Sequence, residues 1–156
     1  MDFIADIEQA IEHRYPGTLL SLVQGGQMPT LLLNRKWVVR VLFVLRDEFD
    51  FESLMCETAS DKRDRIVLIY HLFSTKRRRK LAVKTELPGD DLRVETAEEV
   101  WRAANWYERE IFDLFGVEFV GHSDLVRIML PPDWIGHPLR KDYVPAPEYH
   151  GMKIEW

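Results

Sequence analysis

Apolar residues at the start of the chain recur every three or four positions, which is the spacing of an amphipathic helix. The pattern covers residues 2–14 and ends at Pro16-Gly17, a pair that stops a helix. Two short apolar runs follow, at residues 18–23 and 30–33, with Gly25-Gly26 between them. These runs predict two antiparallel strands joined by a turn that depends on glycine.

Residues 35–46 permit two interpretations. Valines and leucines at helical spacing run from Val38 to Leu45, and Asn34 is a residue type that caps the N-terminus of a helix. The segment is also rich in valine, whose β-branched side chain favours a strand. The sequence alone leaves helix and strand open.

A second pair of strands is predicted at residues 65–74 and 80–87, where apolar and charged residues alternate in the second run. This alternation is typical of a hairpin with one face in water. The turn carries five consecutive basic residues, Lys76 to Lys80. They form either a solvated hairpin tip or a docking patch for an acidic partner surface or anionic lipid headgroups.

A further helix is predicted from Thr96, because Thr96 and Glu99 have the spacing of a capping box. Its apolar stripe continues to Phe115, and Gly116 is suited to ending it. Five of the eight prolines lie between Pro131 and Pro147, and no helix or strand period continues beyond Gly136. We therefore expect a folded domain over residues 1–130 and an extended, partner-binding tail over residues 131–156.

The amino-acid composition and net charge limit the classes of function that the chain can have. The chain has 156 residues, 46% of them hydrophobic, with a net charge of -5, which indicates one globular domain and argues against nucleic acid as a partner. Its single cysteine, Cys56, lies in an apolar context that predicts a buried small side chain. One cysteine also excludes an iron–sulfur cluster held by this chain alone, since such clusters usually take about four. No run approaches the roughly 18 apolar residues of a membrane span, so we expect membrane contact only through another subunit.

The clearest charged pattern is Glu108-Arg109-Glu110 followed by Asp113. Asp113 falls in the last turn of the predicted helix, where the helix dipole disfavours an anion, so a cation should lie close to it. Three interpretations are open: a solvated face, a salt-bridged structural or interface cluster, and an acid–base centre of a free-standing hydrolase using Glu108, Glu110 and His122. No metal-binding spacing of histidine or cysteine and no glycine-rich nucleotide loop is found, so the chain has the pattern of a binding or structural module.

Residues 106–119 (WYEREIFDLFGVEF) begin a longer signature, which continues through GHSDL at 121–125, RIML at 127–130 and GHPLRKDY at 136–143. This run resembles the C-type, or thirty-kilodalton-type, subunit of respiratory complex I, the proton-translocating NADH:quinone oxidoreductase. The resemblance covers roughly residues 30–151. It implies an α+β fold with a mainly antiparallel sheet packed with helices, followed by an extended tail that wraps over a neighbouring subunit.

The resemblance also implies a function. The chain is expected to be a non-catalytic structural or assembly subunit of the peripheral arm, at the cytoplasmic face of the cell inner membrane, within an enzyme that couples NADH-to-quinone electron transfer to proton translocation. It holds no cofactor itself, whereas NADH, FMN, iron–sulfur clusters and quinone are expected in partner subunits of the D, B and I types. The alternative is the equivalent subunit of a membrane-bound hydrogenase or ferredoxin-linked dehydrogenase complex.

The residues that match the family signature predict a subunit interface and no catalytic or metal-binding residue: Glu108, Arg109, Glu110, Asp113, Gly116, His122, Arg127, His137, Pro138, Leu139, Arg140, Lys141, Asp142 and Tyr143. Arg127 and Arg140 are the nearest candidates in sequence for the cation beside Asp113, and a partner protein is another source. Val126 stands where family members often carry a basic residue.

Overall fold

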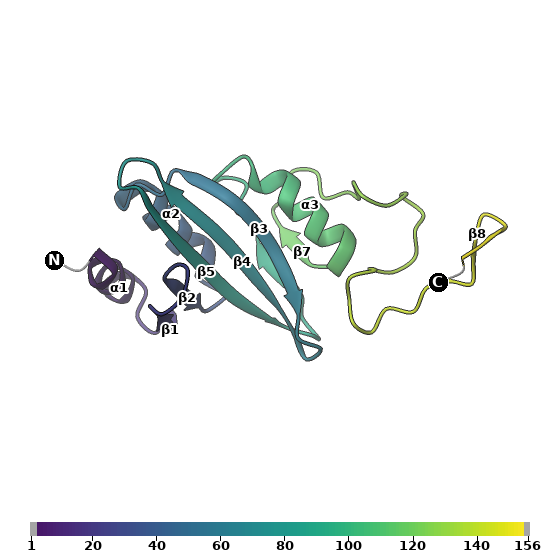
Figure 1. Cartoon of the computed structure of the whole chain (residues 1–156), viewed down its shortest axis with the longest axis horizontal. Coiled ribbons are helices and arrows are strands. Elements are labelled where there is room, and N and C mark those ends of the chain that lie inside the picture. The colour runs from purple at the N-terminus through teal and green to yellow at the C-terminus, as the bar shows by residue number, and fades with distance from the viewer. Residues whose placement is uncertain (1–2, 155–156) are drawn as a thin grey trace.

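The computed structural model describes residues 3–154 and contains a five-stranded sheet, three helices and two small two-stranded sheets (Figure 1). The elements, in chain order, are α1 (Phe3–Arg14), β1 (Leu19–Val23), β2 (Thr30–Leu33), α2 (Val38–Glu48), β3 (Ser53–Asp61), β4 (Arg65–Ser74), β5 (Arg79–Pro88), β6 (Arg93–Glu95), α3 (Ala104–Phe115), β7 (Glu118–Val120), β8 (Glu148–Tyr149) and β9 (Met152–Lys153). Residue 2 of the first predicted helix lies outside the described residues.

The main sheet has the strand order β1-β2-β5-β4-β3. Both predicted hairpins are present, β1 with β2 and β4 with β5. The prediction of a mainly antiparallel sheet is confirmed with one correction: β2 pairs parallel to β5, with Thr30 opposite Ala82 and Leu33 opposite Thr85. Parallel neighbours need a long connection, and here the chain from α2 to β4 supplies it. The fold is therefore α+β with a mixed sheet.

The ambiguous segment is a helix. Six of its residues are buried: Val38, Val39, Val41, Leu42, Val44 and Leu45. The helix thus buries a broad apolar face, and burial outweighs the strand preference of its valines. It begins at Val38, later than predicted, because Asn34 forms the preceding turn, in which its Oδ1 accepts the Lys36 N–H at 3.0 Å.

Strand β3 was not predicted, because its sequence, SLMCETASD, has no clean alternation. It contains Cys56, which is half-buried, so the prediction of a buried small side chain is corrected. Strand β3 lies at the edge of the sheet and packs against α3 (Figure 1).

The basic turn between β4 and β5 is partly neutralised within the chain. Lys76 Nζ and Arg77 Nε lie 2.9 and 2.8 Å from the carboxylate of Asp50. The guanidinium carbons of Arg77 and Arg79 each lie 5.0 Å from the centre of the Phe3 ring. These contacts hold part of the turn against α1 and favour the solvated-tip interpretation over a docking patch.

The start of α3 was predicted wrongly. The helix begins at Ala104, and turns occupy the stretch that follows Thr96. The Thr96 hydroxyl accepts the Glu98 N–H at 3.1 Å and donates to the carboxylate of Glu108. Thr96 therefore links the turn to the helix side chains instead of capping a helix of its own.

The chain after residue 130 leaves the sheet and extends away from it (Figure 1). It is mostly turns, but β8 and β9 form a short hairpin, so the expectation of no strand beyond Gly136 is corrected. This hairpin folds back onto Asp133, which accepts hydrogen bonds from Tyr149 and His150, both at 2.7 Å. Such two-residue strands are too short to give an alternating pattern in the sequence.

Candidate functional site: the junction of α3 and the C-terminal tail

The last turn of α3 holds the start of the tail through Asp113, whose side chain is fully buried. Its Oδ1 accepts a hydrogen bond from Arg127 Nη1 at 2.6 Å. Its Oδ2 accepts the main-chain N–H groups of Ile128, Met129 and Leu130 at 3.1, 2.8 and 2.9 Å. One carboxylate therefore fixes three consecutive residues of the chain that leads into the tail.

The surroundings of Asp113 keep it ionised. Burial by itself raises the pKa of a carboxyl group, because it removes water from the charged form. Hydrogen bonds from the Leu130 N–H, the Arg127 guanidinium and two further N–H groups outweigh burial, so the pKa of Asp113 lies below its ordinary value. The predicted cation is therefore Arg127 of this chain, whereas Arg140 pairs with Asp142 at 3.1 Å.

The Arg127 guanidinium also reaches further along the tail. Its Nη1 donates to the Asp113 carbonyl at 3.1 Å, and its Nη2 donates to the Gly136 carbonyl at 3.0 Å. Arg127, which lies in the chain after β7, thus contacts both the end of α3 and residue 136 of the tail. Because a guanidinium is planar and presents several donors, it can bridge these groups where a lysine could not.

Gly116 and His137 form the second contact between helix and tail. Gly116 ends α3 with φ +76, in the left-handed region. A Cβ atom at this position would lie 2.6 Å from the nearest atom of the His137 ring. His137 Nδ1 lies 2.9 Å from the Asp113 carbonyl oxygen, to which it donates, and Leu139 N donates to Leu114 O at 3.0 Å. The tail therefore folds back over the C-terminus of α3, and only glycine leaves room for it.

Glu108 is buried on another face of α3. Its Oε1 accepts the Ala97 N–H at 2.6 Å, and its Oε2 accepts the Thr96 hydroxyl. Burial raises the pKa of Glu108 to about 7, and the two hydrogen bonds limit the rise. The buried Glu108 side chain thus links α3 to the turn that precedes it in the same chain.

A second buried carboxyl group, Glu57 of β3, feels the charge of Glu108. Glu57 stands opposite Tyr70 in the β3–β4 ladder and is 3% exposed. Among residues 3–154, neither its carboxyl oxygens nor the Tyr70 hydroxyl has a hydrogen-bond partner. Burial raises the pKa of Glu57 well above its ordinary value, and the charge of Glu108 adds to the rise. Sequence reasoning missed Glu57 because a single acid in an irregular strand gives no signal.

His122, in the chain after β7, completes this buried cluster. Its side chain has no exposed surface, and its Nε2 lies 3.9 Å from a Glu108 carboxylate oxygen. The Asp124 N–H donates to Nδ1 at 3.0 Å, which assigns the ring proton to Nε2. Nε2 then donates to the Asn105 carbonyl at 3.1 Å. His122 therefore ties the loop to the start of α3.

The other predicted residues of α3 lie outside this cluster. Arg109 stacks on Trp106, with its guanidinium carbon 5.0 Å from the ring centre, and its Nε donates to the Val126 carbonyl at 3.2 Å. Glu110 is exposed. Val126 contributes only its main-chain carbonyl to this contact.

The predicted tail residues 138–143 form a turn beside the end of the sheet. Leu139 is exposed and Pro138 is half-buried. Tyr143 N donates to the Arg140 carbonyl at 3.2 Å, and the Tyr143 ring packs over Gly136. Lys141 N donates to Asp61 Oδ2 at 2.8 Å, which attaches this turn to the end of β3.

The structure does not assemble an acid–base centre from Glu108, Glu110 and His122. Glu108 and His122 are buried within the chain, while Glu110 is exposed, so no substrate could reach all three. Over residues 3–154, no group of three or more His, Cys, Asp or Glu side chains is arranged to hold a metal ion. Within the same range, no helix has the length and apolar content required to cross a bilayer.

The family model described as "Respiratory-chain NADH dehydrogenase, 30 Kd subunit" matches residues 31–149. The C-type subunit of NADH-quinone oxidoreductase from Trichlorobacter lovleyi is 37% identical to this chain, over 90% of this chain and 91% of the relative. Other relatives carry the combined designation C/D in the same enzyme, and the chain spans about a quarter of their length.

Two solved structures share the fold. One is described as Nqo5 of the trypsin-resistant fragment (1-134), with a TM-score of 0.67 and 25% identity over 80% of this chain and all of that one. The other belongs to a membrane-bound sulfane sulfur reductase, an archaeal respiratory membrane complex, with a TM-score of 0.70 and 26% identity over 90% of this chain and 85% of that one.

Proposed function

Because the chain belongs to the family of the 30 Kd subunit of respiratory-chain NADH dehydrogenase, we propose that it is a non-catalytic subunit in the peripheral arm of NADH-quinone oxidoreductase. The observation that carries this proposal is the match over residues 31–149, which includes α3 and the Asp113 anchor. In such an enzyme, electron transfer from NADH to quinone is coupled to proton translocation, and this chain contributes as one subunit of several.

The non-catalytic role is supported by what the polar residues of the signature do. Asp113 and Glu108 are buried, and they bind other groups of the same chain. Their charges and hydrogen bonds are therefore used to hold the tail and the loops around α3. We infer that the signature specifies the shape of a binding surface.

Partner subunits are expected to bind the cofactors NADH, FMN, the iron–sulfur clusters and quinone. Cys56 is the only cysteine in the chain, and a cluster needs about four. In this proposal the partner subunits carry out the redox chemistry, and this chain contributes to assembly of the complex.

A D-type subunit is the first partner we propose. Relatives with the designation C/D join both types in a single chain, and this chain matches about a quarter of their length. We add subunits of the B and I types as further partners, on the strength of the sequence signature. Membrane contact then comes through the complex, at the cytoplasmic face of the inner membrane.

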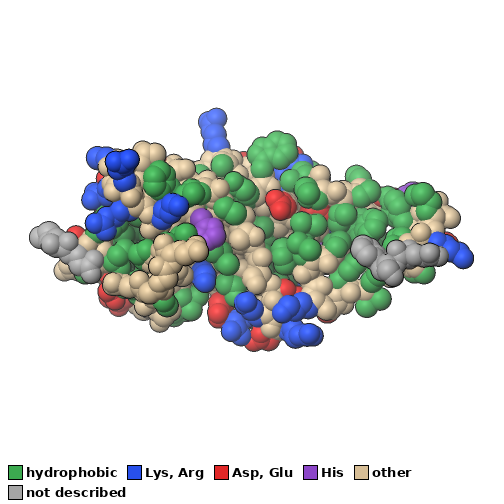
Figure 2. All heavy atoms as spheres, viewed as in Figure 1, with side chains coloured by type: hydrophobic (Ala, Val, Ile, Leu, Met, Phe, Trp, Pro, Cys, Tyr) green, Lys and Arg blue, Asp and Glu red, His purple; other side chains and the backbone are tan. Residues whose placement is uncertain are grey.

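The tail is proposed as the partner-binding segment, distinct from the domain of residues 1–130. Several large apolar side chains on the tail face solvent, and Ile135 and Val144 are 81% and 83% exposed. Figure 2 shows hydrophobic side chains over the part of the molecule that the tail forms. The related Nqo5 structure is described as a trypsin-resistant fragment (1-134), which supports a division of this chain into a stable domain and a tail.

Affinity purification of the tagged chain from detergent-solubilised membranes, followed by mass spectrometry, tests the proposal. We expect the D, B and I subunits to be recovered with NADH- or quinone-linked activity. The Ile135→Asp/Val144→Asp variant should recover less of them, because it charges the exposed apolar surface of the tail. Leu20→Asp/Val23→Asp makes the same change at exposed positions of β1 and should leave recovery unchanged.

Recovery of a nickel–iron hydrogenase subunit instead would move the chain to the alternative complex. A chain that is recovered alone would contradict the assembly role. Equal recovery with both double variants would contradict the role of the tail but leave the subunit assignment intact.

A further inference from the structure

A pocket lies where the tail passes the end of the sheet. Its volume is about 90 Å³, and it is partly open to solvent. Its charged lining comes from the end of β3, the turn between β3 and β4, the start of β4 and the tail: Asp61, Arg63, Arg65, Arg140, Lys141 and Asp142. Four of these six side chains are basic and two are acidic, so the charge of the pocket depends on the partners of the two acids.

Both acids of the pocket already have partners. Asp61 accepts the main-chain N–H groups of Arg63 and Lys141 at 2.6 and 2.8 Å. The Lys141 N–H makes the largest contribution to a pKa of Asp61 below its ordinary value, which keeps this carboxylate ionised. Asp142 pairs with Arg140 at 3.1 Å. Asp142 is thus committed to Arg140, whereas the negative charge of Asp61 also attracts the side chains of Lys141 and Arg140 without a direct ion pair.

The four basic residues divide into two kinds. Arg140 is paired with Asp142, and Arg65 contacts Asp64 and Glu86 at 2.5 and 3.1 Å. By contrast, no carboxylate of residues 3–154 lies within the 4.0 Å of an ion pair from the side-chain nitrogens of Arg63 or Lys141. Neither side chain thus makes a direct ion pair in the described part of the chain, although Asp61, which accepts the main-chain N–H of both residues, also attracts the Lys141 charge at longer range.

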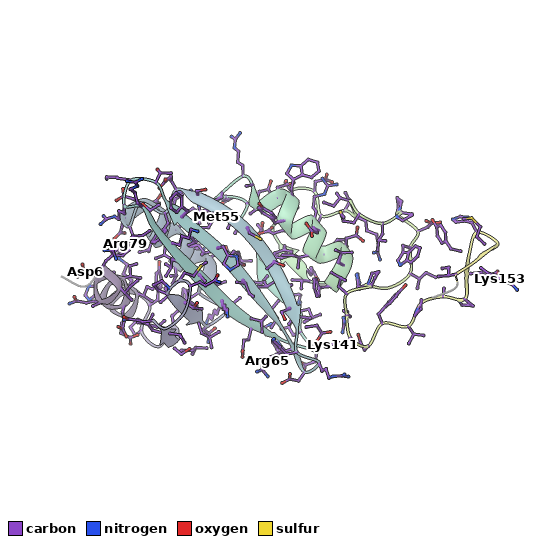
Figure 3. All side chains as sticks on the ribbon, viewed as in Figure 1. Asp6, Met55, Arg65, Arg79, Lys141 and Lys153 are labelled. Carbon is purple, nitrogen blue, oxygen red and sulfur yellow. The ribbon has the colours of Figure 1, made fainter. Side chains whose placement is uncertain are left out.

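Figure 3 labels two of the basic side chains of the pocket. Arg65 and Lys141 lie at the same end of the sheet, beside the ends of β3, β4 and β5 (Figure 3). Figure 2 shows Lys and Arg side chains gathered along this lower edge of the molecule, with acidic side chains between them.

We propose that this pocket binds an oxyanion between Arg63 and Lys141, and that in the complex the oxyanion is a carboxylate side chain of a neighbouring subunit. The second part of the proposal rests on the proposed function. Hydrogen bonds between such cations and a carboxylate or phosphate are charge-assisted and stronger than neutral ones. Because Lys141 belongs to the tail and Arg63 to the turn between β3 and β4, a bound oxyanion would hold the tail against the domain.

The first test uses the isolated full-length chain and inorganic phosphate. Titration followed by NMR should shift the amide signals of Arg63, Gly89 and Lys141. The Arg63→Asn/Lys141→Gln variant should bind phosphate about tenfold more weakly, because two charge-assisted contacts are lost. Asn is chosen because Arg63 has φ +75, a conformation that Asn tolerates.

Arg78→Asn is the matched control. Arg78 also has a left-handed backbone, with φ +52, and it lies in the turn at the opposite end of β4. It therefore removes the same side chain from the same conformation, and phosphate affinity should not change.

The second test measures assembly. Complex purified through a tag on a partner protein should contain less of the Arg63→Asn/Lys141→Gln chain than of the wild type or of Arg78→Asn. If the wild-type chain binds phosphate but the double variant enters the complex as well as the wild type does, the oxyanion bound in the complex is not a carboxylate of a partner subunit. Phosphate shifts that are absent, or equal in the double variant and the control, would overturn the pocket. If the wild-type chain itself joins no complex, the proposed function fails while the phosphate test still stands.

Discussion

The carboxylate of Asp113 and the guanidinium of Arg127, fourteen residues apart in the chain, lie 2.6 Å from each other at the end of α3. A negative charge in the last turn of a helix is opposed by the helix dipole. Here the arginine and three main-chain N–H groups offset that cost. The direction in which the tail leaves the domain therefore depends largely on one side chain.

Replacing Asp113 with Asn removes the charge and keeps the size of the side chain. We expect the free energy of unfolding to fall by about 3 kcal/mol, because the partly buried Arg127 loses its counter-ion. Urea denaturation followed by tryptophan fluorescence measures the change. Glu110→Gln is the matched control at an exposed position and should change stability by less than about 0.5 kcal/mol. Equal losses in the two variants would contradict the anchoring role.

Acid should release the tail before the sheet unfolds. The folded-state pKa of Asp113 lies below its unfolded value, so its stabilisation is complete above an unfolded pKa of about 4 and is lost as the pH falls toward the folded value. Hydrogen exchange measured from pH 6 to pH 3 should show Ile128, Met129 and Leu130 losing protection before the amides of β4. Simultaneous loss in both places would argue against a local anchor.

The buried carboxyl group of Glu57 should cost stability at neutral pH. Glu57→Met replaces an unpaired polar group with an apolar side chain of similar length, so we expect the free energy of unfolding at pH 7 to rise by about 1 to 3 kcal/mol. Thermal and urea denaturation measure it. Glu118→Met, on an exposed position of β7, is the control and should give no comparable gain.

The same variant should alter the dependence of stability on pH. Glu57 and Glu108 both have a pKa raised by burial, to about 7 for Glu108, so between roughly pH 4.3 and 7 the folded chain keeps protons that the unfolded chain releases. The free energy of unfolding of the wild type should therefore fall as the pH rises through this range. Glu57→Met should fall less steeply, and parallel curves would show that Glu57 is not protonated in the folded state.

Gly116→Ala should loosen the tail. Gly116 has φ +76, and a Cβ atom would meet His137 at 2.6 Å. Gly17→Ala separates the two effects, because Gly17 has φ +73 and nothing within 4 Å of the added atom. We expect Gly17→Ala to cost about 1 kcal/mol from its backbone alone and Gly116→Ala to cost more. Trypsin should also cut the tail of Gly116→Ala faster, and equal effects of the two variants would contradict the contact with His137.

Local patterns predicted several parts of the site. The stripe that ends at Phe115 gave the end of α3, and the position of Asp113 in the last turn correctly implied a nearby cation, which is Arg127. Both inferences concern residues within one or two helical turns of each other. Over that distance the spacing of side chains and the effect of the helix dipole can be inferred from the sequence. The family signature supplied what the spacing could not, namely the family.

Features that depend on distant segments were not predictable in the same way. The unpaired carboxyl of Glu57 arises because β3 carries it into the interior of the protein, and nothing in its neighbours signals this. Thr96 looked like a helix cap, but its hydroxyl binds Glu108, twelve residues away. The valines of α2 favoured a strand until the buried surroundings of the segment decided for a helix.

The parallel pairing of β2 with β5 sets an order for folding during synthesis. Residues 30–33 find their partners only at residues 82–85, so β2 stays unpaired on that side until the whole of the intervening chain has left the ribosome. The β4–β5 hairpin closes over a short turn and can form first. Strands β1 and β2 therefore join a sheet whose central strand, β5, is synthesised after them. Until β5 has been made, β2 has an unpaired edge, so the first third of the nascent chain is the segment that most needs protection from aggregation.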